Sequence, residues 1–245
     1  MAPPGTEPVR FTRGAAGVQV AGTAARVPWG NACAHAVVVG ELDRENWIGV
    51  VATAGNVGAV ERNLAGEPRA TLRLDAVPVL ASAPLAGGLE RLRAEGGLLR
   101  SVQMAGAIDR ILAYSLQYAN ERVQFGKPIG KFQAVQHMLA LLAGHAAAAS
   151  AVADLAVEAS AEQAHEFAVA VAKARSGEAA GKAAEIAHQV HGAMGFTHEH
   201  NLHHSTRRLW SWRDEFGNEN FWQERLGRAV AAQGADALWP MVTGL

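Results

Sequence analysis

The chain has 245 residues, of which 49% are hydrophobic and 18% charged, a composition typical of a globular protein. The 22 Lys and Arg residues nearly balance the 23 Asp and Glu residues, so a nucleic-acid binder that works by bulk positive charge is excluded. The single cysteine, Cys33, excludes an intramolecular disulfide and fits a reducing, cytoplasmic compartment. We expect no membrane span, because Gly144 and His145 interrupt the most apolar stretch, residues 138–152.

The N-terminal part has the pattern of β-strands. Three segments are rich in β-branched or alternating apolar residues: 36–39, 47–51 and 70–75. Turn residues (Gly, Pro, Asn and Asp) separate them. Because three strands are too few to close a β domain, we expect them to belong to a larger sheet.

Beyond about residue 84 the chain becomes alanine-rich, with helical periodicity. The pattern predicts helices over 89–123, 132–160, 163–191, 199–210 and 218–233, with breaks at 125–130 and near Ala161. Alanines let helix axes approach closely, which favours an antiparallel bundle. The sequence therefore predicts a mainly α protein, with a partial β domain over 1–84 and a helical bundle domain over 85–245.

Two motifs combine turn residues with polar side chains at the ends of predicted helices. The first reads Arg122-Val123-Gln124-Phe125-Gly126-Lys127-Pro128-Ile129-Gly130-Lys131-Phe132-Gln133, in which an arginine at a helix C-terminus offers a planar fork for a diphosphate. The second reads Gln189-Val190-His191-Gly192-Ala193-Met194-Gly195-Phe196-Thr197-His198-Glu199-His200, in which glycines let the backbone approach a ligand. Taken alone, each motif is explained as well by a helix cap and a turn.

Taken together, in this order and with a long helical gap between them, the motifs resemble the C-terminal half of the acyl-CoA dehydrogenase family. The resemblance is strong after Tyr118 and weak before Leu89. It implies the family's C-terminal helical bundle, preceded by a remnant of its middle β domain. It also implies FAD as cofactor and α,β-dehydrogenation of an acyl-CoA thioester. Since the family's FAD site straddles a subunit interface, a homo-oligomer or a hetero-oligomer with a related subunit is expected.

The resemblance also assigns roles to single residues. Arg122 would bind the FAD diphosphate, Phe125 would pack near the cofactor, and Gln133 would contact its adenosine half. Three residues would bind the cofactor of a neighbouring subunit: Gln189, His191 and Gly192. Trp29, in the turn Trp29-Gly30-Asn31, would lie against the isoalloxazine ring.

The catalytic base is displaced from both positions that the family uses. Counted without gaps, these positions fall on Phe216 and on Gly96, and Glu215 and Glu95 are their neighbours. A slip of one residue turns a helical side chain by about 100°. Glu215 is the candidate base if the turn is remodelled. Otherwise the chain suits a partner subunit that lacks its own base.

Other interpretations stay open at the level of sequence. The chain could be a non-catalytic interaction protein that keeps only the bundle, or a truncated and inactive family member. The N-terminal part is shorter than in the family, and Gly192-Ala193 replaces the usual Gly-Gly. A cluster of four histidines follows the second motif (His198, His200, His203 and His204), but no carboxylate-rich site accompanies it, and we expect no metal.

Overall fold

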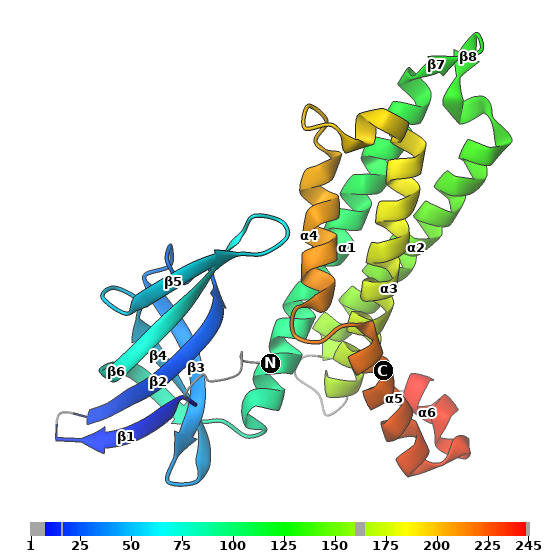
Figure 1. Ribbon diagram of the computed structural model, residues 1–245. Helices are drawn as coiled ribbons and strands as arrows, with labels where there is room; N and C mark the ends of the chain where they lie inside the picture. The colour runs from blue at the N-terminus through cyan, green and yellow to red at the C-terminus, as the bar shows by residue number, and fades with distance from the viewer. Residues whose placement is uncertain (1–7, 16, 160–164, 244–245) are drawn as a thin grey trace. The chain divides into compact units, whose positions relative to one another are not determined.

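The computed structural model describes residues 8–15, 17–159 and 165–243 (Figure 1). The chain divides into two compact units, the first ending at Arg93 and the second starting at Ala94. The division lies inside helix α1 (Gly88–Glu121), nine residues after the boundary that the sequence suggests. Each unit has its own core, and each is described by itself below.

The first unit is a six-stranded β structure. Its strands are β1 (Arg10–Gly14), β2 (Gly17–Pro28), β3 (His35–Leu42), β4 (Glu45–Ala52), β5 (Val57–Arg62) and β6 (Pro68–Pro84). Their order is β2-β1-β3-β4-β6-β5, and β6 also pairs with β2. These pairings close a ring, and they confirm that the strands predicted at 36–39, 47–51 and 70–75 belong to a larger, six-stranded sheet. The 17-residue strand β6 makes closure possible, because it is long enough to pair with three partners.

The core of this ring is small and tightly packed. Phe11, Val20, Val51 and Leu72 are each at most 3% exposed. A Cβ at Gly49 would lie 2.6 Å from the Phe11 ring, so only glycine lets β4 pass this closely. The sheet therefore has a hydrophobic interior of its own.

The second unit is a helical bundle. After α1 come α2 (Gln133–Glu158), α3 (His165–His191), α4 (Leu202–Asp214), α5 (Glu219–Gln233) and α6 (Leu238–Thr243). The five helices predicted from periodicity are all present, which confirms the mainly α fold with a partial β domain. The predicted break near Ala161 lies outside the described residues.

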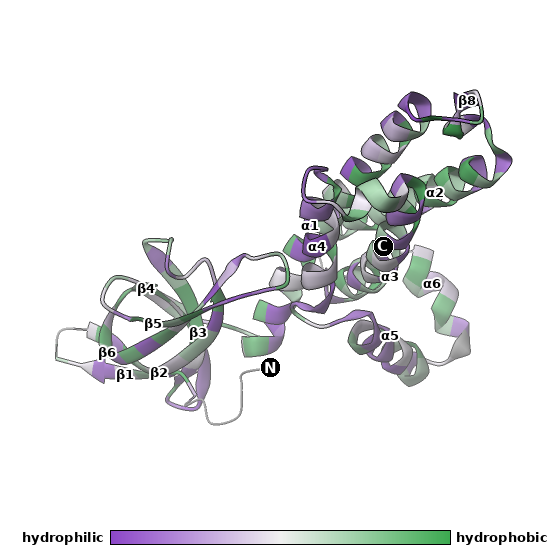
Figure 2. Ribbon diagram, turned by 45° about the horizontal axis from the view of Figure 1, so that its top comes forward, coloured by the Kyte–Doolittle hydropathy of each residue, from purple (hydrophilic) through white to green (hydrophobic). Residues whose placement is uncertain are grey.

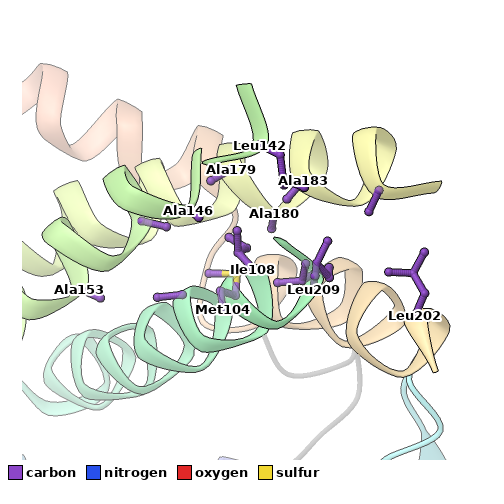
Figure 3. Close-up of a cluster of buried hydrophobic side chains, with 14 residues drawn as sticks. Met104, Ile108, Leu142, Ala146, Ala153, Ala179, Ala180, Ala183, Leu202 and Leu209 are labelled. Carbon is purple, nitrogen blue, oxygen red and sulfur yellow. The ribbon is translucent and has the colours of Figure 1, made fainter. Parts of the chain in front are cut away.

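Alanines on α3 form the centre of the bundle. Figure 3 shows Ala179, Ala180 and Ala183 facing larger side chains such as Ile108 of α1 and Leu209 of α4, and all five are fully buried. Because the alanines project so little, α2 and α4 can pack closely against α3. The alanine-rich composition thus sets how near the helices lie.

Helix α2 is apolar on more than its buried face. By length and composition alone α2 could cross a membrane, which the sequence analysis did not expect. Only 28% of its most apolar stretch is buried. Figure 2 colours long parts of it as hydrophobic, and Leu141 on its outer side is 62% exposed. Core helices of soluble proteins can be equally long and apolar, so no membrane assignment follows. An exposed apolar face also suits contact with another protein.

Candidate cofactor and substrate site

The first sequence motif forms a hairpin between α1 and α2. Strands β7 (Val123–Gln124) and β8 (Lys127–Pro128) pair across it, and a 3-10 turn over Ile129–Lys131 leads into α2. Arg122 lies at the start of the hairpin and Gln133 at its end, and both are exposed. The Arg122 guanidinium has no ion-pair partner within the described ranges, so it is available to an anion.

Phe125 stands at the tip of this hairpin in an unfavourable backbone conformation. Its φ is 53° and that of Gly126 is 78°, the pair of positive angles that a tight two-residue hairpin turn requires. The Phe125 side chain is 92% exposed, and its ring meets only the edge of Phe132 at 6.1 Å between centroids. A large apolar ring held out in this way is typical of a residue that contacts a ligand or a partner.

The second motif closes α3 and continues into a 3-10 turn over Gly192–Phe196. Gln189 and Gly192 are exposed. Gly192 has a φ of 58° and no atom within 4 Å of where a Cβ would stand, so a ligand could approach its backbone. His191 differs, because its side chain is 2% exposed and Nδ1 lies 2.7 Å from the Ala187 carbonyl oxygen. The structure therefore presents Gln189 and the Gly192 backbone, but not the His191 imidazole, to solvent.

A stacked pair of rings brings the two motifs together. Tyr118, one turn before Arg122, stacks on His191 with 4.6 Å between centroids. Both motifs therefore lie at the same end of the bundle (Figure 1). Burial lowers the pKa of His191 and of His188, one turn earlier on α3, which favours neutral imidazoles at this end.

Trp29 belongs to the β unit, in the turn after β2. Its φ is 56°, its amide donates to the Pro68 carbonyl at 3.1 Å, and its side chain is 46% exposed. The indole is thus anchored through its backbone and free on one side, as a residue that packs against a flat ring would be.

The two positions at which the resemblance predicts a base meet in space. A Cβ added to Gly96 of α1 would lie 2.3 Å from Cδ1 of Phe216, so the phenylalanine ring packs directly over the glycine. Phe216 follows α4 in a turn with a φ of 59°, and the next residue, Gly217, has a φ of 100°. Positions far apart in the sequence, identified separately by counting, are therefore neighbours, and both are apolar.

The neighbouring carboxylates have other partners. Nε and Nη2 of Arg100 lie 2.7 Å and 2.5 Å from Oε2 of Glu215, and the two side chains are 11% and 18% exposed. Oε1 of Glu95 lies 3.2 Å from Nε2 of His165 in α3. The Arg100 guanidinium therefore holds Oε2 of Glu215 through two contacts. The role of Glu215 as base stays a prediction, and its geometry favours a structural role.

The histidine cluster forms ring contacts. His200 lies edge-on to Tyr118 and to His191, and the His203 ring contacts those of His198 and His204. Within the described ranges no group of three His, Cys, Asp or Glu side chains is arranged to hold a metal ion.

Two cations that the sequence analysis did not single out hold the end of α4 and the turn after it. Arg100 holds Glu215, and Lys173 is fully buried in the middle of α3. A lysine among alanines, in the stretch Ala170-Val171-Ala172-Lys173-Ala174, was the only available signal. Its partner groups are main-chain carbonyls of α4 and of the turn after it, which no sequence pattern reveals.

The sequence of this chain is similar to that of known proteins. The sequence profile described as acyl-CoA dehydrogenase, C-terminal domain, matches residues 94–232. Acyl-CoA dehydrogenase IpdE2 of Mycobacterium tuberculosis is 38% identical over 107 residues, which are 43% of this chain and 32% of that protein. The match therefore spans about a third of the length of this curated relative.

Solved structures extend the likeness to both units. The ChsE4-ChsE5 complex from Mycobacterium tuberculosis contains a chain that superposes with a TM-score of 0.81 at 25% identity, over 95% of this chain and 65% of that one. Butyryl-CoA dehydrogenase from Megasphaera elsdenii superposes with a TM-score of 0.80 at 21% identity, over 91% and 63%, and shows the fold alone. Since the profile covers more than half of the chain, the protein belongs to the acyl-CoA dehydrogenase family.

Proposed function

We propose that this chain is a subunit of an FAD-dependent acyl-CoA dehydrogenase that introduces a double bond between Cα and Cβ of an acyl-CoA thioester, and that it lacks a base of its own. The observation that carries the proposal is the contact between Phe216 and Gly96. The place where the family resemblance puts a proton acceptor is filled by an aromatic ring. The chain would then act with a related subunit that provides the base.

The end of the bundle that carries both motifs fits FAD. The exposed Arg122 guanidinium offers the fork that binds a diphosphate, and Gly192 leaves its backbone open to a ligand. Phe125 offers an exposed ring for a flat part of the cofactor. When bound, FAD would accept the hydride from Cβ of the substrate.

The remaining half of the reaction needs a proton acceptor for the Cα proton. Such a group must reach the proton directly and carry a free lone pair. Phe216 has none, and Oε2 of Glu215 accepts from Arg100 in a salt bridge that gives this carboxylate a structural role. The residues of this chain would therefore bind the cofactor and exclude water, while the proton goes to the partner.

A partner subunit is supported by the outer surface of the bundle. The Phe125 ring and the outer face of α2 around Leu141 are apolar and exposed, and covering them would remove apolar area from water. A complex of two named subunits, ChsE4 and ChsE5, is among the similar structures. We propose a cytoplasmic complex of this type.

The test is a flavin spectrum of the purified full chain, with and without added FAD, combined with its mass in solution. The measurement is repeated after co-expression with candidate family members. A yellow, stoichiometric complex that oxidises an acyl-CoA supports the proposal. A colourless oligomer in every combination would instead support a non-catalytic bundle protein, and an aggregated product a truncated, inactive member.

The missing base is tested in the active complex. We expect Glu215→Gln to leave turnover per bound flavin unchanged, because the proton goes elsewhere. A loss of a hundredfold or more, with flavin still bound, would restore Glu215 as the base. The corresponding carboxylate of the partner subunit should show that loss instead.

A further inference from the structure

Lys173 is a charged residue in the interior of the bundle. It lies in the middle of α3, and its side chain is fully buried. Its Nζ donates to three main-chain oxygens: those of Trp212 at 3.2 Å, Arg213 at 2.7 Å and Gly217 at 2.8 Å. An ammonium group has three donors, so each has an acceptor.

These acceptors belong to the end of one helix and to the turn after it. Trp212 and Arg213 are in the last turn of α4, which ends at Asp214, where carbonyls have no donor within the helix. The third acceptor, Gly217, lies in the turn that follows. One ammonium group therefore joins the end of α4 to the chain that leaves it.

The turn held in this way is strained. Phe216 has a φ of 59°, a conformation that costs a non-glycine residue about 1–2 kcal/mol. Its carbonyl accepts a hydrogen bond from Nε1 of Trp222 at 3.2 Å, and its ring covers Gly96. The hydrogen bonds from Lys173 and Trp222 flank this residue, and they oppose the relaxation of its backbone.

We propose that Lys173 is the positioning residue for the turn at 214–217 and keeps the Phe216 ring over Gly96. Lys173 acts through the main chain, since Nζ donates to three carbonyl oxygens. That the ring fills a base position rests on the proposed function. That Lys173 holds the turn does not.

The pKa of Lys173 predicts how the opening of the end of α4 depends on pH. Desolvation by burial lowers the pKa of Lys173 from 10.5 to about 7. The groups that face it are carboxylates and guanidiniums: Asp214, Glu215, Arg100 and Arg213, with Glu219 of α5 paired to Arg213. In the closed structure Lys173 therefore loses its charge near neutral pH.

Opening the end of α4 would release Lys173 to water, where it takes up a proton. Above pH 7 the closed state holds the neutral amine, which keeps two of the three N–H donors, and the open state holds the ammonium. Opening therefore takes up a proton and becomes harder as the pH rises. The effect is up to about tenfold in the opening constant per pH unit. Residues that open without releasing Lys173 would not show this dependence.

The experiment is amide hydrogen exchange on the full chain from pH 6 to 9, expressed as protection factors for residues 211–214. We expect wild-type protection to be flat below pH 7 and to rise above it. In Lys173→Met these amides should lose about tenfold or more of their protection at pH 8, and the rise should disappear. Lys182→Met is the matched control, because Lys182 lies on the same helix, is exposed and pairs with Glu185, and it should behave like wild type.

Two results would overturn the proposal: wild-type protection at 211–214 that is flat across the whole pH range, or equal protection in Lys173→Met and wild type. The wild-type series is decisive even if Lys173→Met does not fold. The measurement needs neither flavin nor partner. Its failure is therefore distinguishable from failure of the proposed function, which the flavin spectrum decides.

Discussion

The contact between Phe216 and Gly96 can be tested by adding a single methyl group. In Gly96→Ala the new Cβ would lie 2.3 Å from Cδ1 of Phe216, with two more ring carbons within 2.6 Å. Real Cβ atoms are essentially never found so close, so the ring must move out of a strained, hydrogen-bonded turn. Overpacking of this kind costs about 1–3 kcal/mol.

A second effect acts in the opposite direction. Replacing glycine by alanine inside a helix stabilises it by about 0.8–1 kcal/mol. Gly106, on the same helix α1, isolates this term, because nothing lies within 4 Å of where its Cβ would be. We therefore expect Gly106→Ala to be stabilised by about 1 kcal/mol, and Gly96→Ala to lie about 1–3 kcal/mol below it.

The assay is thermal unfolding of the helical unit in the full chain, followed by calorimetry. For a unit of this size, 1 kcal/mol corresponds to about 2–4 °C in Tm, so the two variants should differ by several degrees. Adding Phe216→Ala should remove most of that difference, since the clash then has no partner. If Gly96→Ala melts together with Gly106→Ala, Phe216 does not cover Gly96, and the structural argument for a missing base fails.

Three further expectations concern the cofactor end and the ion pair. Arg122→Ala should weaken FAD binding about tenfold to a hundredfold, because one charge-assisted contact is lost. Flavin fluorescence measures the affinity, with Arg228→Ala as control, and an unchanged affinity would contradict the role of Arg122. Because burial lowers the pKa values of His188 and His191 in the folded chain, below about pH 6.5 the unfolded chain binds protons that the folded one does not. The free energy of unfolding should therefore fall as the pH falls, by up to about 1.4 kcal/mol per pH unit for each histidine, and a flat urea-unfolding profile from pH 6.5 to 5 would refute this. Glu215→Gln should cost about 1–3 kcal/mol of stability, because it leaves the Arg100 charge half-satisfied in a largely buried site, and a neutral effect in denaturant titration would contradict the structural role of Glu215.

How much the sequence determines differs between the two units. The helices are predicted nearly to their ends, because amphipathic periodicity and Gly/Pro breaks are local signals. The β unit is not, because β5 is exposed along its whole length and has no apolar alternation to detect. Closure of the ring depends on β6 pairing with β2, a contact between residues about fifty positions apart that no local pattern encodes.

The candidate site divides in the same way. By itself the sequence determined the family, the helical bundle and the two motifs with Arg122 and Gln189, since residue types at fixed spacing carry that information. Only the tertiary structure decided that Phe216 fills the space above Gly96, that Arg100 occupies Glu215, and that Lys173 holds the end of α4. The physical reason is that a proton acceptor is defined by its neighbours in space, and those neighbours come from three helices distant in the sequence.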